Sequence, residues 1–576
     1  MIKLMKYLKP IEWLQFFVVI GLVVCVVAID MQLPDYMADI MAKIQVGSTT
    51  LEILKIGAIM LGLSFASILF SGAAGFFSAR ISAGLCRTVR AKLFDKVGQF
   101  SMQEINRFST ASLITRSTND ITQLQNTYAI GIRMIFTAPI MAIWAIVKII
   151  DKSGDLSLVT AVALVIMLLG LISILMFALP KFTKLQKAVD RVNLVTRENL
   201  TGLRVVRAYN AENIQSEKFE DSNIKLSKLN LFLNRVMALL SPFMTIIMSG
   251  LSLALVWFGA YLIGDGLLDV PSLMAFTQYS SLVLMSFIML SMMFIMLPRA
   301  EVSAKRVREV LNSQSSIVDG TQSFPQDTKG TIQFKNVDFA YPEAKDKVLQ
   351  DINFEVNSGE TLAIIGSTGS GKSTIINLLM RFYDITSGEI FIDGKNIKEV
   401  PLKDLYNKIG YVPQKSTLFS GTVEDNVGYG MSDKDKKTIK KAIQISQAEE
   451  FVEKQKGKLK YHISQGGANL SGGQKQRLSI ARALSRKPEF LFFDDSFSAL
   501  DFTTDKKLRE ALKEDSNQST KIIVAQRIGT VMDADKIMVL NEGKMLGFGT
   551  HKQLMKNCPV YRELAYSQLS KEDLSR

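Results

Sequence analysis

The sequence predicts a multidomain protein, with an all-α membrane domain of six spanning helices and long helical extensions, followed by an α/β P-loop domain. Three observations predict this architecture. Six long apolar segments fill the first half of the 576 residues, the pattern becomes β-rich from Thr331, and a glycine-rich phosphate-binding motif follows a buried strand. We expect the membrane domain at residues 1–311, a linker at 312–330 and the P-loop domain at 331–576.

The apolar segments approach the roughly 20 residues that a bilayer-spanning helix needs. They lie near Trp13–Ile29, Ile53–Phe77, Ala129–Ile150, Leu158–Leu179, Met237–Ile263 and Pro271–Leu297. Any one of them is also compatible with a buried core helix, but a soluble domain does not repeat runs of this length six times. The first follows Lys3, Lys6 and Lys9 as a secretory signal does, yet no small-x-small cleavage site comes after it. We therefore expect an uncleaved first span.

The basic residues are concentrated in particular connections. Lys and Arg number 68 against 54 Asp and Glu, which gives a net charge of +14. The excess lies at the N-terminus and between spans two and three and spans four and five. The other connections carry acidic residues: Asp35, Asp39, Asp151, Asp155, Asp265 and Asp269. Since Lys and Arg mark cytoplasmic connections, both termini are predicted to be cytoplasmic, and nucleic-acid binding loses its main support.

The two basic connections are about 50 residues long, which is longer than structureless loops usually are. Both carry apolar residues at helical spacing, as in Leu85, Val89 and Leu93. We therefore expect spans two to five to continue beyond the membrane as long helical hairpins. A charged helix, Arg299–Leu311, should follow span six and end in the polar linker.

The soluble half contains a phosphate-binding motif in its required context. Thr361–Ile365 is typical of a buried strand, and Ile375–Leu379 of a helix. The motif between them consists of Gly366, Ser367, Thr368, Gly369, Ser370, Gly371, Lys372, Ser373 and Thr374. Its glycines let backbone N–H groups close around phosphates at the helix N-terminus. Lys372 is expected to reach the β- and γ-phosphates, and Ser373 to ligate Mg²⁺.

A second apolar strand, Phe490–Asp494, is followed by a further carboxylate, Asp495. In a P-loop protein the first carboxylate at such a strand end, here Asp494, supports Mg²⁺, through a water in our assignment. Asp495 stands where a base or a water-orienting group is expected. An apolar run before two aspartates is weak evidence alone, but together with the P-loop it indicates a nucleotide site.

A third motif precedes another helical stretch and consists of Leu470, Ser471, Gly472, Gly473 and Gln474. A serine with two glycines makes an anion-binding helix N-terminus. An ordinary N-cap turn explains this spacing equally well. Because one P-loop already holds one triphosphate, the functional alternative is a contact with the nucleotide of another domain.

Together these motifs resemble the half-transporters of the ATP-binding cassette (ABC) exporters, over essentially the whole chain. Leu470–Gln474 matches the signature that separates this family from other P-loop ATPases. The resemblance implies a six-helix membrane domain fused to one nucleotide-binding domain, with ATP and Mg²⁺ as cofactors. It assigns Tyr341 to adenine stacking, Gln414 to the Q-loop near Mg²⁺, and Asp501 to the D-loop. The cytoplasmic hairpin tips, within residues 106–120 and 202–212, resemble coupling helices that dock on nucleotide-binding domains.

The chain departs from the family pattern at two catalytic positions. Asp495 replaces the catalytic Glu, and Gln526 replaces the switch-loop His. Gln465 is a milder change, since many exporters have Glu there. The resemblance is thus to the degenerate-site subunit of bacterial heterodimeric multidrug exporters. It implies a site that hydrolyses ATP slowly, and a partner half-transporter with Glu and His at these positions, whose site this chain's signature completes.

We expect a subunit that exports amphiphilic drugs or dyes across a bacterial cytoplasmic membrane. Export of lipid or peptide, and a membrane-anchored ATP-sensing subunit without transport, are the alternatives. Asp30, at the outer end of span one, is the acidic residue placed to meet a cationic substrate. The Met-rich span six suits either promiscuous binding or packing. Arg133 and Lys148, near the ends of span three, are interpreted as snorkelling side chains.

Overall fold

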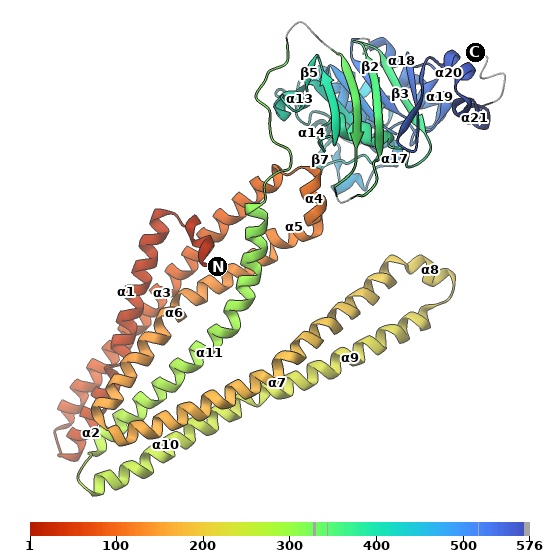
Figure 1. Ribbon diagram of the computed structural model, residues 1–576. Helices are drawn as coiled ribbons and strands as arrows, with labels where there is room; N and C mark the ends of the chain where they lie inside the picture. The colour runs from red at the N-terminus through yellow and green to blue at the C-terminus, as the bar shows by residue number, and fades with distance from the viewer. Residues whose placement is uncertain (326–329, 343, 516–517, 570–576) are drawn as a thin grey trace. The chain divides into compact units, whose positions relative to one another are not determined.

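The computed structural model describes residues 1–325, 330–342, 344–515 and 518–569 (Figure 1). They form two compact units. The first unit comprises Met1–Lys96 and Ala111–Ser313, and the second comprises Val97–Thr110 and Gln314–Arg576. The chain is a mostly helical six-helix membrane domain joined to an α/β domain, as the sequence predicts.

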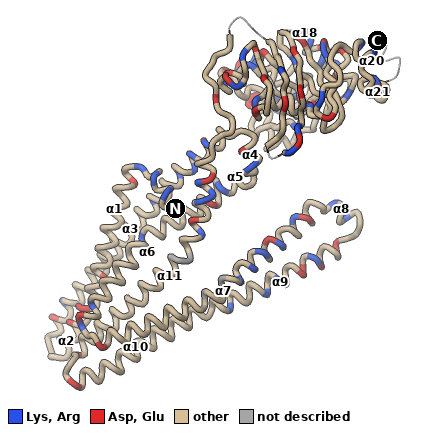
Figure 2. The backbone as a smooth tube through the Cα atoms, viewed as in Figure 1, with Lys and Arg blue, Asp and Glu red and all other residues tan. Residues whose placement is uncertain are grey.

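Six helical segments among the described residues are long and apolar enough to cross a membrane, which agrees with the predicted number of spans. They are Pro10–Gln45, Thr50–Gly98, Thr110–Lys152, Gly154–Thr201, Glu212–Gly264 and Val270–Asn312. Long stretches of these helices carry no charged side chain (Figure 2). The elements are a 3₁₀ turn at Ile2–Tyr7, α1 (Pro10–Asp30), α2 (Leu33–Gln45), α3 (Thr50–Gly98), α6 (Asn119–Lys152), α7 (Gly154–Thr201), α9 (Glu212–Ala238), α10 (Leu240–Gly264) and α11 (Val270–Asn312).

The first span is broken between α1 and α2, which the sequence analysis did not predict. Pro34 lies in the first turn of α2, where its missing N–H costs nothing, but it disfavours one continuous helix. Asp35 and Asp39, expected in a short connection, therefore lie in α2. Asp35 forms ion pairs with Lys148 at 2.8 Å and Lys152 at 3.2 Å. Lys148, interpreted from the sequence as a snorkelling side chain, thus has an ion-pair partner that ties α6 to α2.

The long hairpins predicted between spans two and three and between spans four and five are present. Their tips are short helices: α4 (Met102–Phe108) and α5 (Thr110–Ser117) in the first, and α8 (Leu203–Ala208) in the second. Of the first tip, α4 belongs to the second unit, where Asn106 Nδ2 donates to Tyr383 Oη at 2.9 Å. This contact agrees with the docking implied for a coupling helix. Docking of α8 on a nucleotide-binding domain stays a prediction.

The described part of the second unit has two main sheets, and β7 and β8 form a short third one. The larger has the strand order β12-β11-β3-β10-β9-β6, parallel except for β12, and the smaller is antiparallel with the order β2-β1-β4-β5. β9 and β10 are buried at every position, as expected for central parallel strands covered on both faces. The strands are β1 (Ile332–Phe339), β2 (Leu349–Val356), β3 (Thr361–Gly366), β4 (Ser387–Ile392), β5 (Lys395–Asn396), β6 (Ile409–Val412), β7 (Gly421–Thr422), β8 (His462–Ile463), β9 (Phe490–Asp494), β10 (Thr520–Val524), β11 (Lys536–Asn541) and β12 (Lys544–Gly549).

Helices flank these strands (Figure 1). They are α12 (Lys372–Leu379), α13 (Leu402–Lys408), α14 (Val423–Val427), α15 (Lys436–Ile445), α16 (Glu449–Glu453), α17 (Gly472–Ser485), α18 (Phe502–Asp515), α19 (Ile528–Val531), α20 (His551–Asn557) and α21 (Pro559–Gln568). The core divides into two clusters of buried side chains. Ala363 and Phe493 belong to one cluster, and Ile364 and Phe492 to the other. Because neighbouring residues of a strand point to opposite faces, β3 and β9 contribute to both clusters.

Candidate nucleotide-binding site

Four neighbouring parallel strands bring the predicted site residues to one edge of the larger sheet. The P-loop follows β3, Gln526 follows β10, and Gln414 follows β6. Asp494 is the last residue of β9, and Asp495 comes directly after it. In the sheet these strands lie in the order β3-β10-β9-β6. Since ligands of α/β sheets bind beyond the carboxyl ends of the strands, the fold places these groups where a nucleotide is expected.

The P-loop has the backbone geometry that its glycines allow. Gly371 has a φ of 99°, in the left-handed region, and an added Cβ there would lie 2.7 Å from a Leu349 methyl carbon. A side chain at this position is thus disfavoured both by conformation and by space. Lys372 begins α12, and its Nζ donates to the carbonyls of Gly366 at 2.9 Å and Ser367 at 2.7 Å. The ammonium group therefore lies inside the loop that is predicted to hold phosphates.

The two groups predicted near Mg²⁺ are in direct contact. Ser373 Oγ donates to Asp494 Oδ1 at 2.6 Å. Burial raises the pKa of Asp494; the Ser373 hydrogen bond partly offsets this, and the Asp495 charge adds to it. Mg²⁺ prefers one or two protein oxygens together with phosphate and water oxygens, so a hydroxyl beside a buried carboxylate fits this ion. Burial also lowers the pKa of Lys372, against the effect of the nearby Asp495 and Asp494 charges.

The two positions that depart from the family pattern are joined by a hydrogen bond. Gln526 Nε2 donates to Asp495 Oδ2 at 2.7 Å, and Gln414 Nε2 donates to the same oxygen at 3.3 Å. Asp495 is buried and its φ is 48°, so its backbone is in the left-handed conformation. Its N–H donates to Val524 O at 3.0 Å, which fixes the end of β9 on β10. The carboxylate is thus held between two neutral amides.

Tyr341 lies against the start of α12. Its hydroxyl is 3.1 Å from Thr374 Oγ1 and accepts a hydrogen bond from Asn377 Nδ2 at 3.4 Å. The Tyr341 ring packs edge-on against Phe339 and Tyr383, with centroids 4.8 and 5.1 Å away. These contacts fix the orientation of the ring beside the P-loop helix. Its assignment to adenine stacking stays a prediction.

The signature motif forms a well-made helix start. Ser471 is the N-cap of α17, and its N–H donates to Gln474 Oε1 at 3.0 Å while its Oγ accepts from Gln474 N at 3.4 Å. Ser471 and Gly472 are exposed, and an added Cβ at Gly472 would meet nothing within 4 Å. These hydrogen bonds form a helix cap, and the exposed surface beside it also leaves room for a ligand. Both interpretations offered by the sequence are therefore compatible with the geometry.

Asp501 has a structural role that the sequence analysis missed. Its Oδ2 accepts the N–H of Thr504 at 3.0 Å, at the start of α18. This hydrogen bond lowers the pKa of Asp501. An Asp-x-x-Thr pattern before a helix is a capping signal that the sequence alone offered. A second missed feature is the contact of Ser416 Oγ with Gln476 Oε1, which connects the segment after Gln414 to α17.

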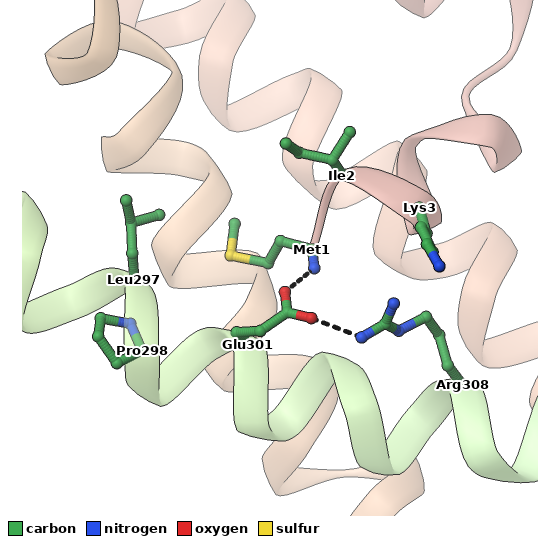
Figure 3. Close-up of a pocket in the computed structure, with 7 residues that line it drawn as sticks. All are labelled: Met1, Ile2, Lys3, Leu297, Pro298, Glu301 and Arg308. Carbon is green, nitrogen blue, oxygen red and sulfur yellow. Dashed lines mark hydrogen bonds and ion pairs between the residues drawn. The ribbon is translucent and has the colours of Figure 1, made fainter.

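A separate hollow of about 500 Å³ lies in the membrane unit (Figure 3). It is lined by Met1, Ile2, Lys3, Leu297, Pro298, Glu301 and Arg308. The Glu301 carboxylate pairs with the amino group of Met1 and with the Arg308 guanidinium (Figure 3). These ion pairs hold the first turn of the chain on α11. Since the charges satisfy one another, the hollow offers no free polar group of this trio to a ligand.

Comparison with known proteins identifies the class. Residues 16–288 match the family model for the ABC transporter transmembrane region, and residues 349–498 match that for ABC transporters. An uncharacterized ABC transporter ATP-binding protein of Mycobacterium tuberculosis is 38% identical over 544 residues, covering 94% of this chain and 93% of that protein. A similar protein of Bacillus subtilis is 33% identical over 571 residues, covering 99% of both. The chain belongs to the ABC transporters.

Two further relatives refine this picture. A multidrug resistance ABC transporter ATP-binding and permease protein of Lactococcus lactis is 28% identical over 572 residues, covering 99% of this chain and 95% of that protein. The fold matches a bacterial Atm1-family ABC exporter structure with ATP bound, with a TM-score of 0.83, 22% identity, and coverage of 98% of this chain and 99% of that one. The chain is thus an ABC transporter in which a transmembrane region is followed by an ATPase domain that binds ATP, and it is a multi-pass membrane protein with the fold of that structure.

Proposed function

We propose that this chain is one subunit of a heterodimeric exporter, and that its own site binds ATP but hydrolyses it slowly. The proposal rests mainly on the arrangement around Asp495, whose Oδ2 accepts hydrogen bonds from both Gln526 and Gln414. A general base must reach the proton that it takes, about 2.6–3.2 Å away. An oxygen that already accepts from two amides is poorly available for this task.

The length of the side chain adds to the effect. Asp495 is one methylene shorter than the Glu of the family pattern, so its carboxylate ends about 1.5 Å nearer the backbone. A misplacement of about 1 Å costs roughly 100-fold in rate. Gln526 donates hydrogen bonds but, unlike His, carries neither a proton nor a positive charge toward the γ-phosphate. Both changes slow hydrolysis without removing the phosphate-binding groups.

ATP binding should be retained because the P-loop groups are intact. Lys372 supplies the cation for the terminal phosphates, and Ser373 and Asp494 supply oxygens for Mg²⁺, the aspartate through a water. Gln414 turns its Nε2 toward Asp495, which leaves its carbonyl oxygen as the atom for the metal. Bound Mg²⁺ would neutralise charge on the phosphates, while Tyr341 would stack on the adenine.

A second, different chain completes the proposal. A homodimer would contain two impaired sites and no efficient one. The exposed Ser471 and Gly472 leave the signature free to complete the nucleotide site of a partner. We therefore propose a related half-transporter with Glu and His at the positions of Asp495 and Gln526. Closure of the two ATPase domains around ATP would drive the switch of the membrane domains.

We further propose that the complex exports small amphiphilic compounds across a bacterial cytoplasmic membrane, with both termini in the cytoplasm. The charge distribution among the connections supports this orientation. The multidrug resistance relatives from Lactococcus lactis support the substrate class. Dye transport by the purified complex in vesicles is the test. Binding of ATP without any transport of dye would favour a sensing subunit instead.

The asymmetry of the two sites has its own test in the purified pair. Asp495→Asn should reduce ATPase activity modestly, since this site contributes little. Changing the partner's matching Glu to Gln should nearly abolish the activity. Vigorous ATPase activity of this chain purified alone would contradict the heterodimer.

A further inference from the structure

An arginine inside the third span has no partner within the described part of the chain. Arg133 lies on α6, and no ion pair or hydrogen bond of its guanidinium is found there, while its Nε is fully buried. A charged group in a membrane-spanning helix is costly unless another group compensates it. Arg133 was expected to snorkel, but its Nε is buried and therefore not turned to water.

The surroundings of Arg133 include a second unpartnered polar group. An added Cβ at Gly75 on α3 would lie 3.2 Å from Arg133 Nη1, so the guanidinium rests directly over this glycine. Ser78, one turn further along α3, has a fully buried Oγ with no hydrogen bond. Ser82 Oγ, in the next turn, donates to Gln125 O of α6 at 2.5 Å, so this face of α3 is turned to α6. Two unsatisfied polar side chains thus lie on facing surfaces of α3 and α6.

Among the residues that the structure describes, no carboxylate forms an ion pair with Arg133. Glu12, the buried carboxylate of α1, lies beside Gly84 and accepts the N–H of Lys9 at 2.8 Å. Gly84 is nine residues from Gly75, about 13 Å along α3 at 1.5 Å per residue. Arg133 is 15 residues from Lys148, or about 22 Å along α6, in a hydrocarbon core about 30 Å thick. In the proposed orientation Arg133 therefore lies in the cytoplasmic leaflet.

An aromatic cluster begins one helical turn from Arg133 along α6. Phe136, one turn outward of Arg133 on α6, packs edge-on against Phe16 of α1 with centroids 5.8 Å apart. Trp13 and Phe17 extend this cluster and are 38% and 63% exposed. Such side chains suit acyl chains near a membrane interface. A cation and a hydroxyl beside an apolar aromatic surface match the two ends of an anionic amphiphile.

We propose that Arg133 and Ser78 bind the phosphate-bearing headgroup of an anionic amphiphile, whose chains lie on the Trp13, Phe16 and Phe17 cluster. A guanidinium is suited to phosphate because it donates two parallel hydrogen bonds to it. The molecule that carries this headgroup is either a resident phospholipid or a transported amphiphile, since both present a phosphate to the guanidinium. The proposal does not depend on the slow ATPase site, and only its assignment to the cytoplasmic leaflet rests on the proposed orientation.

The first experiment measures binding of phosphatidylglycerol to the transporter captured through a tag on this chain, by native mass spectrometry in detergent. Arg133→Gln should weaken binding at least about tenfold, the effect of losing one charge-assisted hydrogen bond. Arg133→Lys should weaken the binding of phosphatidylglycerol less, because it keeps the positive charge. Binding of a diacylglycerol with the same acyl chains, which has no phosphate, should be the same in all variants.

Two glycines of α3 provide a matched pair that leaves the arginine in place. Gly75→Ala should weaken phosphatidylglycerol binding, because a Cβ there would lie 3.2 Å from Arg133 Nη1 and shift the guanidinium by a few tenths of an ångström. Gly72→Ala should not, since a Cβ at Gly72 meets nothing within 4 Å. Equal effects of the two alanines would overturn the site, as would unchanged phosphatidylglycerol binding by Arg133→Gln. Loss of a co-purifying partner chain in Arg133→Gln, with lipid binding intact, would assign the guanidinium to the subunit interface and also overturn it.

The second experiment distinguishes a resident phospholipid from a transported amphiphile. Fluorescent phosphatidylglycerol in proteoliposomes is followed by quenching of the outer leaflet, with and without ATP. ATP-dependent movement that Arg133→Gln slows identifies a transported amphiphile. Binding that depends on Arg133 without such movement identifies a resident lipid. Both results support the anionic headgroup site.

Discussion

The contact between Asp495 and Gln526 predicts that the two departures from the family pattern must be reversed together. Gln526 Nε2 lies 2.7 Å from Asp495 Oδ2, so no space remains for a longer acid. Asp495→Glu alone adds about 1.5 Å and pushes the carboxylate against the glutamine amide. Gln526→His alone leaves the acid short of the water. Each single change should therefore raise hydrolysis little.

The double variant Asp495→Glu/Gln526→His should restore both the reach of the base and the protonatable partner. If a misplacement of about 1 Å costs roughly 100-fold, correcting it should raise the rate at this site by up to about 100-fold, which is about 2.7 kcal/mol of barrier. In a double-mutant cycle the coupling between the two positions should be about 1 kcal/mol or more. The gain should exceed the product of the two single effects.

The assay is steady-state ATPase activity of the captured complex in which the partner's catalytic Glu has been changed to Gln, so that this site dominates the signal. Adding Lys372→Ala to the double variant is the control, and it should remove the gain because it disables this P-loop. Independent, multiplicative effects of Asp495→Glu and Gln526→His would refute the argument from their contact. A double variant no faster than the parent would refute the slow-site explanation itself.

The remaining predictions concern the nucleotide, the metal and the membrane. Lys372→Ala should weaken labelling of this chain by a photoreactive ATP analogue, because it removes the cation for the terminal phosphates. Tyr341→Ala should lower the affinity for adenine, because the stacking ring is lost. Unchanged labelling in both variants would mean that the pocket is misplaced. Chelation of Mg²⁺ should reduce ATP affinity more in the parent than in Asp494→Asn, measured by fluorescent nucleotide titration, and equal losses would remove Asp494 from the metal site. Single cysteines tested with an impermeant reagent from outside should react near Asp39 in α2 and near Asp265 after α10, but not near Arg107 or Arg207 at the hairpin tips. The reverse pattern would contradict the orientation.

The features that the sequence predicted depend on local patterns. Six apolar runs fix the number of spans, and the P-loop was recognisable because strand, glycines and helix follow one another within about 20 residues. The features that it did not predict join segments that are distant along the chain. The ion pair of Asp35 with Lys148 bridges 113 positions, and no local pattern around either residue specifies it. The inclusion of residues 97–110 in the second unit is of the same kind.

The candidate site shows the same division between local and long-range information. Each residue could be assigned by motif, but the contacts among Gln414, Asp495 and Gln526 depend on the order in which the strands lie. In the sequence β6 is the next of these strands after β3, whereas in the sheet β10 and β9 lie between β3 and β6. This order brings the ends of three strands together, and motif spacing does not encode it. The alternative role of Asp501 as a helix cap, in contrast, was available locally from the Thr504 spacing.

The geometry changes how the two substitutions at the site are understood. Read separately, Asp495 and Gln526 are two losses of catalytic groups. In the structure they form one satisfied pair, because a buried carboxylate needs hydrogen-bond donors and the Gln526 amide supplies one at 2.7 Å. Under the proposed function, a neutral partner that fits the shorter acid would keep the site folded and able to hold nucleotide, without the proton that hydrolysis requires. The same contact would then stabilise the site for binding and oppose catalysis, and a single reversal should disturb binding before it restores hydrolysis.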